Sequence, residues 1–258
     1  MIQPELHFYD FGTGVRAFSS TRKGGYSEGN YGEFNINHYC GDSEDAIRQN
    51  RCLLCQLLQI EDEHLIMPHQ VHQTEVLAVD EAFMRLSASE RKARLEGVDA
   101  VMTDIAGVCI GVSTADCIPV LLYDRAHHAS CAIHAGWRGT VMRIVEKAVA
   151  QMASVYGSNP SDLLAQVGPG IHLESFEVGD EVYEAFANEG FATIAVRMGQ
   201  KWHIDLPECN RQQLLAAGIL MGQISVSSVD TYQQHETFFS ARRLGINSGR
   251  IFTGILMI

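Results

Sequence analysis

Residues 98–137, VDAVMTDIAGVCIGVSTADCIPVLLYDRAHHASCAIHAGW, decide the fold. Short runs rich in valine, isoleucine and other apolar residues alternate with turn-forming residues. This pattern predicts a cluster of buried β-strands. The runs span residues 98–104, 107–114, 118–124 and 130–137.

The flanking segments predict helices and further strands. An amphipathic pattern over residues 43–60 predicts a helix capped by Ser43 or Asp42. A second pattern over residues 140–156 predicts a helix capped by Thr140. Another helix is expected within residues 175–190, a strand followed by a helix within 201–220, and strands at 163–170, 224–232 and 250–258.

No linker, internal repeat or shift of composition divides the chain. We therefore expect a single mixed α/β domain over residues 1–258, with helices packed on a mixed sheet. Hydrophobic residues make up 46% of the chain and charged residues 19%, which favours a large core over disorder.

The net charge of −12 argues against nucleic acid as a partner, because it repels a phosphate backbone and no run of Lys and Arg opposes it. A small anion held by a few converging arginines remains compatible with this charge, since a local pocket can oppose the global field.

The expected cellular location of the protein and the expected redox state of its cysteines follow from the next observations. No basic and apolar leader opens the chain, and no apolar run reaches the ~18 residues of a membrane span. The seven cysteines are an odd number and are expected to be reduced thiols in the cytoplasm. Cys52 and Cys55 form a CxxC inside a helical pattern, where two thiols on or near an apolar helix face are the favoured interpretation.

Three segments place a reactive side chain at a strand end or in an adjoining loop. His72 lies in HQVHQ (69–73), Cys117 in TADC (114–117) and His134 in AIHAGWRGT (132–140). Such loops carry functional groups in α/β proteins. In an extended HQVHQ segment His69 and His72 point to opposite faces, so only one is expected to reach a shared site.

These residue types leave three interpretations open. His72, Cys117 and His134 are ligand types that zinc prefers, and three protein ligands leave one position for water. Alternatively, Cys117 is a nucleophile with His134 as its base and Asp116 or His72 orienting the base. The third is a buried thiol beside ordinary core histidines. Spacings of 45 and 17 residues carry too little specificity to decide.

With these motifs assembled, the chain resembles the laccase-domain family, long named multicopper polyphenol oxidases and understood as zinc-dependent purine nucleoside phosphorylases. The stretch from TADC to HAGWRG is the most specific part of the resemblance, which covers nearly the whole chain. Other matching motifs are STRKGGYSEGNYGEFNI (20–36), GDSEDAIRQNR (41–51), VGPGI (167–171), HIDLPECNRQQLLAAGI (203–219) and FFSARR (238–243).

The resemblance implies the laccase-domain fold, which is related to cysteine hydrolases. It further implies that His72, Cys117 and His134 bind one zinc ion, with copper able to bind in vitro. A multicopper oxidase needs many histidines in His-x-His pairs, and no such pair occurs among the 11 histidines. The supply of ligands therefore argues against the older multicopper oxidase interpretation.

The resemblance also implies the reaction and the partners. Purine nucleosides (adenosine, inosine, guanosine and methylthioadenosine) are cleaved with phosphate, and adenosine is deaminated. Asp116 is the candidate acid/base for deamination. The candidates for phosphate binding are Arg22, Lys23, Arg138 and Arg242 or Arg243.

Two other functional classes are competing hypotheses. A cysteine hydrolase acting on an amide would use Cys117 and His134 as its catalytic pair. A nucleoside- or metal-binding protein would bind without turnover. The sequence does not reveal the oligomeric state.

Overall fold

The apolar runs of residues 98–137 form strands β5 (Ala100–Thr103), β6 (Cys109–Thr114), β7 (Ile118–Asp124) and β8 (Ala129–Ala135). Every residue of these strands is buried in the computed structural model, which describes residues 2–258. Met1, part of the predicted domain, lies outside the described residues. The prediction of a buried strand cluster is confirmed.

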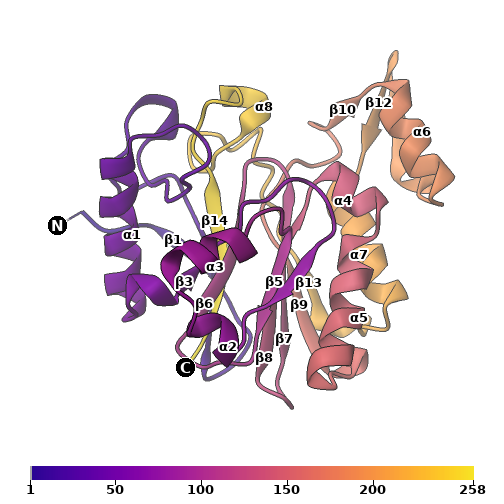
Figure 1. Ribbon diagram of the computed structural model, residues 1–258. Helices are drawn as coiled ribbons and strands as arrows, with labels where there is room; N and C mark the ends of the chain where they lie inside the picture. Colours follow the sequence, from indigo (N-terminus) through magenta and orange to yellow (C-terminus); the bar gives the residue numbers. More distant parts are fainter. Residues whose placement is uncertain (1) are drawn as a thin grey trace.

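The four strands of this cluster are divided between two sheets (Figure 1). β5, β7 and β8 belong to a six-stranded sheet with the order β13-β9-β7-β8-β5-β4, whereas β6 belongs to a five-stranded sheet with the order β1-β2-β14-β6-β3. A smaller sheet has the order β10-β12-β11. Both large sheets are mixed, because β4–β5, β9–β13 and β3–β6 pair in parallel and the other neighbours antiparallel.

The remaining strands are 2 to 7 residues long, and β14 at the C-terminus is the longest of them. Their bounds are β1 (Leu6–Tyr9), β2 (Val15–Ser20), β3 (Leu65–Ile66), β4 (Val76–Ala78), β9 (Leu163–Val167), β10 (Glu177–Val178), β11 (Ala195–Met198), β12 (Lys201–Ile204), β13 (Ile224–Val226) and β14 (Ile251–Met257).

The predicted α/β class is confirmed, but the expectation of one helix-covered sheet is wrong. The two large sheets stack face to face. In β7, Val120 and Leu122 belong to the core under the helices, whereas Leu121 and Tyr123 belong to the core shared with the five-stranded sheet. Successive residues of a strand face opposite sides, so a strand covered on both sides is apolar throughout. The apolar sequence of such a strand therefore does not indicate whether a helix or a second sheet covers each of its faces.

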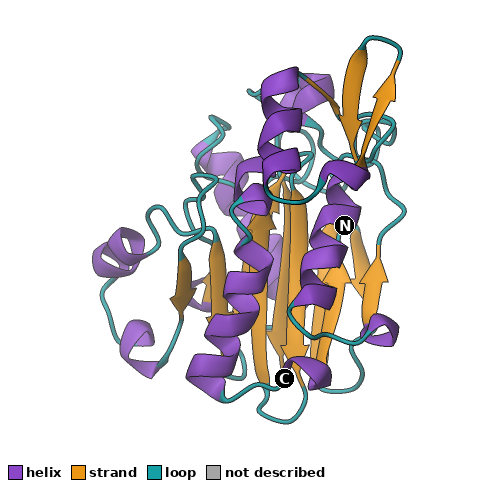
Figure 2. Ribbon diagram, turned by 90° about the vertical axis from the view of Figure 1, so that its right-hand side faces the viewer, coloured by secondary structure: helices purple, strands orange, loops and turns teal. Residues whose placement is uncertain are grey.

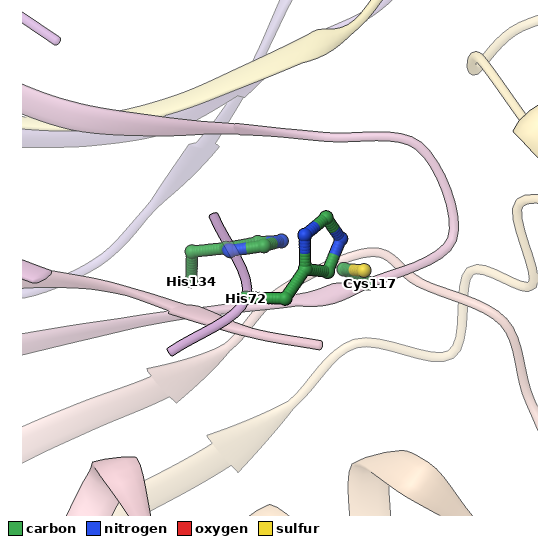
Figure 3. Close-up of side chains that lie close together, drawn as sticks. All are labelled: His72, Cys117 and His134. Atoms are coloured by element: carbon green, nitrogen blue, oxygen red, sulfur yellow. The ribbon is translucent and has the colours of Figure 1, made fainter. Parts of the chain in front are cut away.

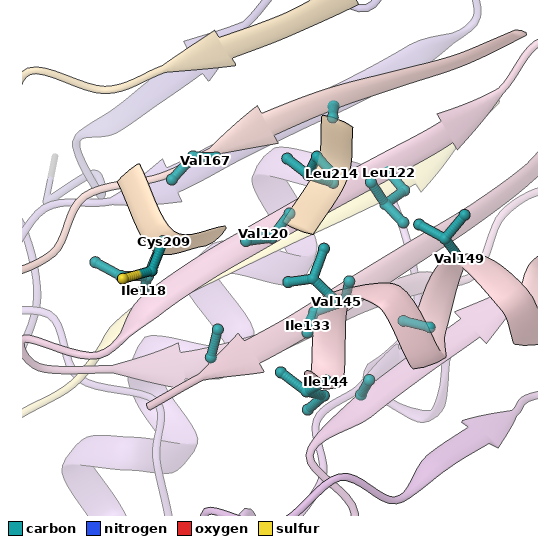
Figure 4. Close-up of a cluster of buried hydrophobic side chains, with 14 of the residues drawn as sticks. Ile118, Val120, Leu122, Ile133, Ile144, Val145, Val149, Val167, Cys209 and Leu214 are labelled. Atoms are coloured by element: carbon teal, nitrogen blue, oxygen red, sulfur yellow. The ribbon is translucent and has the colours of Figure 1, made fainter. Parts of the chain in front are cut away.

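Helices cover the two outer faces. α5 (Ile144–Tyr156) and α7 (Leu206–Ala216) lie on the six-stranded sheet, and α1 (Glu44–Leu58) lies on the five-stranded sheet (Figures 1 and 2). Figure 4 shows the core under α5 and α7, where apolar side chains of both helices meet those of β7 and β8. The layers therefore run helix, sheet, sheet, helix.

The helix predictions are confirmed for most segments. α1 begins after Ser43, whose side chain accepts a hydrogen bond from the Ala46 N–H, as predicted. The predicted Thr140 cap is wrong: Thr140 lies inside the short helix α4 (Trp137–Val141), and α5 starts only after Arg143. The shorter helices are α2 (Glu81–Met84), α3 (Ala88–Arg94), α6 (Asp180–Asn188) and α8 (Ala241–Leu244).

The end of β6, the start of β7 and the end of β8 come together at one end of the stacked sheets. β7 pairs with β8 so that Ile118 lies opposite Ala135. Gln70 extends this end, since its side-chain amide exchanges two 2.8 Å hydrogen bonds with the backbone of Ser113. Among residues 2–258, no helix has the length and apolar character needed to span a membrane.

Candidate metal centre

His72, Cys117 and His134 come together from three separate segments (Figure 3). Their ligand atoms all lie within 4.8 Å of one another. His134 is the buried penultimate residue of β8, Cys117 ends the turn between β6 and β7, and His72 lies in the loop between β3 and β4. The structure thus brings together the three residues that the sequence singled out.

The loop before β4 presents only one of its histidines to this group. His72 has φ of 63°, so this segment is not the extended chain that we expected. His69 Nδ1 lies within hydrogen-bond distance of Glu96 Oε1 (2.7 Å), and its ring stacks on Tyr39 at 4.0 Å between ring centroids. The expectation that only one of these histidines joins the three-residue group is right. The reason is the left-handed backbone conformation of His72, and not the alternation of side chains along a strand.

The backbone of Gly136 lies against the side chains of His72 and Cys117. A Cβ at this position would lie 2.8 Å from His72 Cδ2 and 3.1 Å from Cys117 Sγ. Any larger residue would push these side chains out of place, so the three-residue group depends on glycine here.

Asp99 contacts both His72 and His134, and the sequence analysis did not single it out. Its carboxylate is completely buried and accepts hydrogen bonds from His134 Nδ1 (2.7 Å), the His72 N–H (2.9 Å) and the Gln73 N–H (2.7 Å). The signal that could have found it is an acidic residue at the head of the apolar run 98–104. A buried carboxylate needs such donors.

The electrostatics of the group favour a thiolate. Burial raises the pKa of the Cys117 thiol, but the charge of His134 and hydrogen bonds from both imidazoles outweigh it and lower the pKa below its usual value. Burial lowers the pKa of His134, yet the Cys117 thiolate and Asp99 raise it on balance. In contrast, burial alone raises the pKa of the core thiol Cys131. A thiolate serves equally as a metal ligand and as a nucleophile.

The residues present fit a zinc ion. One thiolate and two imidazoles are borderline-soft donors of the kind zinc prefers. With Zn–S of about 2.3 Å and Zn–N of about 2.0–2.1 Å, two donors on one ion lie roughly 3–4 Å apart. The observed separations, all within 4.8 Å, are close to this range. Three protein donors leave a coordination position for a water or a substrate.

All three side chains border a cavity of about 360 Å³, which is in the size range of small-molecule sites. Thr114 also lines it; this residue is 1% exposed, and its hydroxyl has no hydrogen-bond partner among the described residues. The other lining residues are Asn37, Tyr39, Cys40, His69, Gln70, Ser113, Ala115, Ala241, Ile246 and Arg250.

Asp116, the candidate acid/base, is engaged away from the three-residue group. Its carboxylate accepts hydrogen bonds from the Thr231 hydroxyl (2.8 Å) and from the backbone N–H of Arg242 (2.7 Å). It has φ of 87° and does not line the cavity. Orientation of His134, which we considered for Asp116, is performed by Asp99.

The arginine and lysine of the Gly-rich loop lie outside the cavity lining. Arg22 donates to the carbonyl oxygens of Gly32 and His235, each at 2.8 Å, and lies 5.1 Å from the Phe239 ring centroid. These contacts tie the loop to the C-terminal segment. Lys23, its neighbour, is half-buried.

The remaining predicted cations lie over aromatic rings. Arg138 lies 4.2 Å from the Trp137 ring centroid, Arg242 lies 5.7 Å from that of Phe176, and Arg243 lies 5.2 Å from that of Tyr232. None of the three is among the residues that line the cavity. Arg250 does line it, and sequence reasoning had not singled it out as a ligand-binding residue.

Comparison with known proteins gives the family. Residues 16–258 match the family described as multi-copper polyphenol oxidoreductase laccase. The chain is 47% identical to the purine nucleoside phosphorylase of Bacteroides thetaiotaomicron over 94% of this chain and 92% of that protein. It is 43% identical to adenosine deaminase RL5 of an unknown prokaryotic organism, over 97% and 98%.

A solved structure, the hypothetical protein YfiH of Bacillus licheniformis, agrees with a TM-score of 0.92 and 29% identity, covering 99% of this chain and 97% of that one. YlmD of Geobacillus stearothermophilus agrees with a TM-score of 0.89 and 29% identity, covering 95% and 92%. The chain therefore belongs to the laccase-domain family, and relatives in this family are named purine nucleoside phosphorylase and adenosine deaminase.

Proposed function

We propose that the protein is a zinc-dependent purine nucleoside phosphorylase that cleaves adenosine, inosine, guanosine and methylthioadenosine with phosphate and also deaminates adenosine. The observation that carries this proposal is the convergence of His72, Cys117 and His134 on the wall of a cavity. The names of relatives that align over nearly the whole chain support the substrate class.

In this proposal His72, Cys117 and His134 hold zinc, and the bound ion supplies a Lewis-acidic centre that can polarise a water or a substrate atom. The cavity walls bind the nucleoside and exclude bulk water. In phosphorolysis the phosphate oxygen attacks the ribose carbon while the bond to the base breaks, so a cation must hold the phosphate. Arg22, Lys23, Arg138 and Arg243 remain our proposed cations, to which we add Arg250 because it lines the cavity.

Deamination of adenosine needs a group that moves protons to the departing ammonia. We keep Asp116 as the proposed acid/base. Its hydrogen bonds to Thr231 and the Arg242 N–H support a second contribution, which is to hold the turn that carries Cys117.

The assay that tests the function uses zinc-loaded protein and adenosine, with and without phosphate, followed by chromatography. We expect adenine and ribose 1-phosphate only when phosphate is present, and inosine under both conditions. Hypoxanthine should accumulate with phosphate as inosine is cleaved in turn. Absence of phosphate-dependent base release would refute the phosphorylase, and absence of inosine as well would favour a protein that binds nucleosides without turnover.

Thr114 supplies the first prediction. Valine matches the shape of threonine without its hydroxyl, so T114V should leave the melting temperature unchanged or higher while raising KM for the nucleoside about 10-fold. The reason is that Thr114 lines the substrate cavity and that its buried hydroxyl has no hydrogen-bond partner among residues 2–258. Thr253→Val is the control: its hydroxyl lies 2.6 Å from Ser19 Oγ, so this variant should lose stability and keep KM. Unchanged KM in T114V would contradict a substrate contact.

Arg138 supplies the second prediction. Removing a phosphate-binding cation by Arg138→Ala should raise KM for phosphate roughly 10-fold or more and leave adenosine deamination intact. Arg197→Ala is a matched control, because Arg197 also lies over a tryptophan, at 5.5 Å from the Trp202 ring centroid. Equal losses of both activities in Arg138→Ala would instead indicate a nucleoside contact or a folding defect.

A cysteine hydrolase is the second candidate, favoured by the contact of Cys117 with His134 and of His134 with Asp99. Thiolate, imidazole and carboxylate in this order form a nucleophile, a base and an orienting group. Metal analysis separates the two functions. Stoichiometric zinc that protects Cys117 from alkylation supports the phosphorylase, whereas metal-free protein with amidase activity lost on alkylation of Cys117 supports the hydrolase.

A further inference from the structure

Asp99 connects the two segments that carry the histidines. Besides its carboxylate contacts, its backbone N–H donates to the Glu75 carbonyl (3.0 Å) and its carbonyl accepts from the His134 N–H (2.8 Å). The residue therefore fastens the loop of His72 to the end of β8 through both its main chain and its side chain.

The contact with His134 determines which ring nitrogen faces the site. A carboxylate only accepts hydrogen bonds, so the 2.7 Å contact is made by Nδ1–H donating to Asp99 Oδ1. Nε2 is then left for the side of the ring that faces His72 and Cys117. Metal-binding histidines are commonly fixed by a carboxylate in this way.

The contacts with the loop determine where His72 points. The N–H groups of Val71 (3.3 Å), His72 (2.9 Å) and Gln73 (2.7 Å) converge on the same carboxylate. They hold His72 at φ of 63°, a left-handed conformation that a non-glycine residue adopts only at a cost. Without this anchor the loop can relax and carry the His72 ring away.

We infer that Asp99 is a positioning residue that presets both histidine ligands of the metal centre and thereby sets its zinc affinity. This inference rests on the metal role proposed above for His72, Cys117 and His134. It assigns one side chain to two ligands at once: the ring orientation of His134 and the backbone conformation of His72 share the same two oxygens.

Asp99→Asn is the informative substitution because it keeps the shape of the side chain. Asparagine offers one carbonyl oxygen, and its NH₂ group would face N–H donors, so at least half of the contacts are lost. Asp124 provides the matched control. It too is fully buried, and it accepts from His127 Nδ1 (2.8 Å) and from the Ala126 N–H (2.8 Å) at the far end of β7.

The experiment measures zinc dissociation constants by competition with a chromophoric chelator for the full-length wild type, Asp99→Asn and Asp124→Asn. We expect Asp99→Asn to bind zinc 10- to 100-fold more weakly, in the range known for loss of such a partner, and Asp124→Asn to match the wild type. Melting temperatures measured without metal identify general destabilisation, which should affect both variants. Equal zinc affinity of Asp99→Asn and the wild type would overturn the inference while leaving the metal centre intact.

A second measurement needs no variant and covers the case in which Asp99→Asn does not fold. In zinc-loaded wild type, ¹⁵N NMR of the imidazoles should show His134 with a slowly exchanging proton on Nδ1 and zinc on Nε2. Zinc on Nδ1 would overturn the inference. A wild type that binds no zinc at all would refute the proposed function itself, which distinguishes the two failures.

Discussion

Replacing Cys117 by alanine is expected to abolish phosphorolysis and deamination together and to release the metal. Cys117 supplies the only sulfur atom of the three-residue group, and two imidazoles alone are a weak zinc site. The loss of zinc affinity should exceed the ~10- to 100-fold cost of removing a partner of a ligand. Elemental analysis after desalting and the adenosine assay measure the two effects, and His72→Ala should give the same result.

Cys131→Ala is the control for this substitution. Cys131 is a fully buried thiol of β8 in the core under the helices, away from the three-residue group. Its loss should lower the melting temperature, because it leaves a small cavity, and retain one zinc ion per chain. Full turnover and a full complement of zinc in Cys117→Ala would refute the site.

Gly136→Ala should disable the centre by adding a single methyl group. Gly136 has φ of −67°, which alanine adopts freely, so backbone strain plays no part. The new Cβ would lie 2.8 Å from His72 Cδ2 and 3.1 Å from Cys117 Sγ, and both side chains must move. A misplacement of about 1 Å in an active site can cost about 100-fold in rate. We expect activity to fall by about that factor, with zinc affinity reduced in parallel.

Gly222→Ala is the control, since a Cβ there meets nothing within 4 Å. It should retain zinc and activity. Thermal unfolding of Gly136→Ala distinguishes a local effect from overpacking of the core, which typically costs about 1–3 kcal/mol. Wild-type turnover in Gly136→Ala would show that the observed approach of the three side chains is not the active arrangement.

The strands were predictable from the sequence, but their assignment to sheets was not. The apolar runs that become β6 and β7 are consecutive and alike, yet the turn of residues 115–117 carries the chain from one sheet to the other. Burial on both faces produces the same pattern whether a helix or a sheet provides the cover. The assignment of residues 1–258 to one domain and the relation to cysteine hydrolases stay predictions.

The site was predictable in its residue types more than in its geometry. Spacings of 45 and 17 residues say nothing about contact, because the pairing of β7 with β8 and the loop before β4 create it. Asp99 was missed because most of its partners are backbone N–H groups, which no residue pattern reports. The prediction that Thr140 caps a helix was wrong because its side chain makes a tertiary contact instead. Thr140 Oγ1 accepts a 3.2 Å hydrogen bond from Asn210 Nδ2 in the buried contact with α7.

X-ray absorption spectroscopy at the zinc edge measures the central claim most directly, because it counts the atoms bound to the ion. For the wild type loaded with one zinc per chain, binding by Cys117, His72 and His134 predicts one sulfur at about 2.3 Å and two imidazole nitrogens at about 2.0–2.1 Å, with one further light atom from water. A zinc shell without sulfur, or with more than one, would contradict the assignment of these three side chains to a common ion.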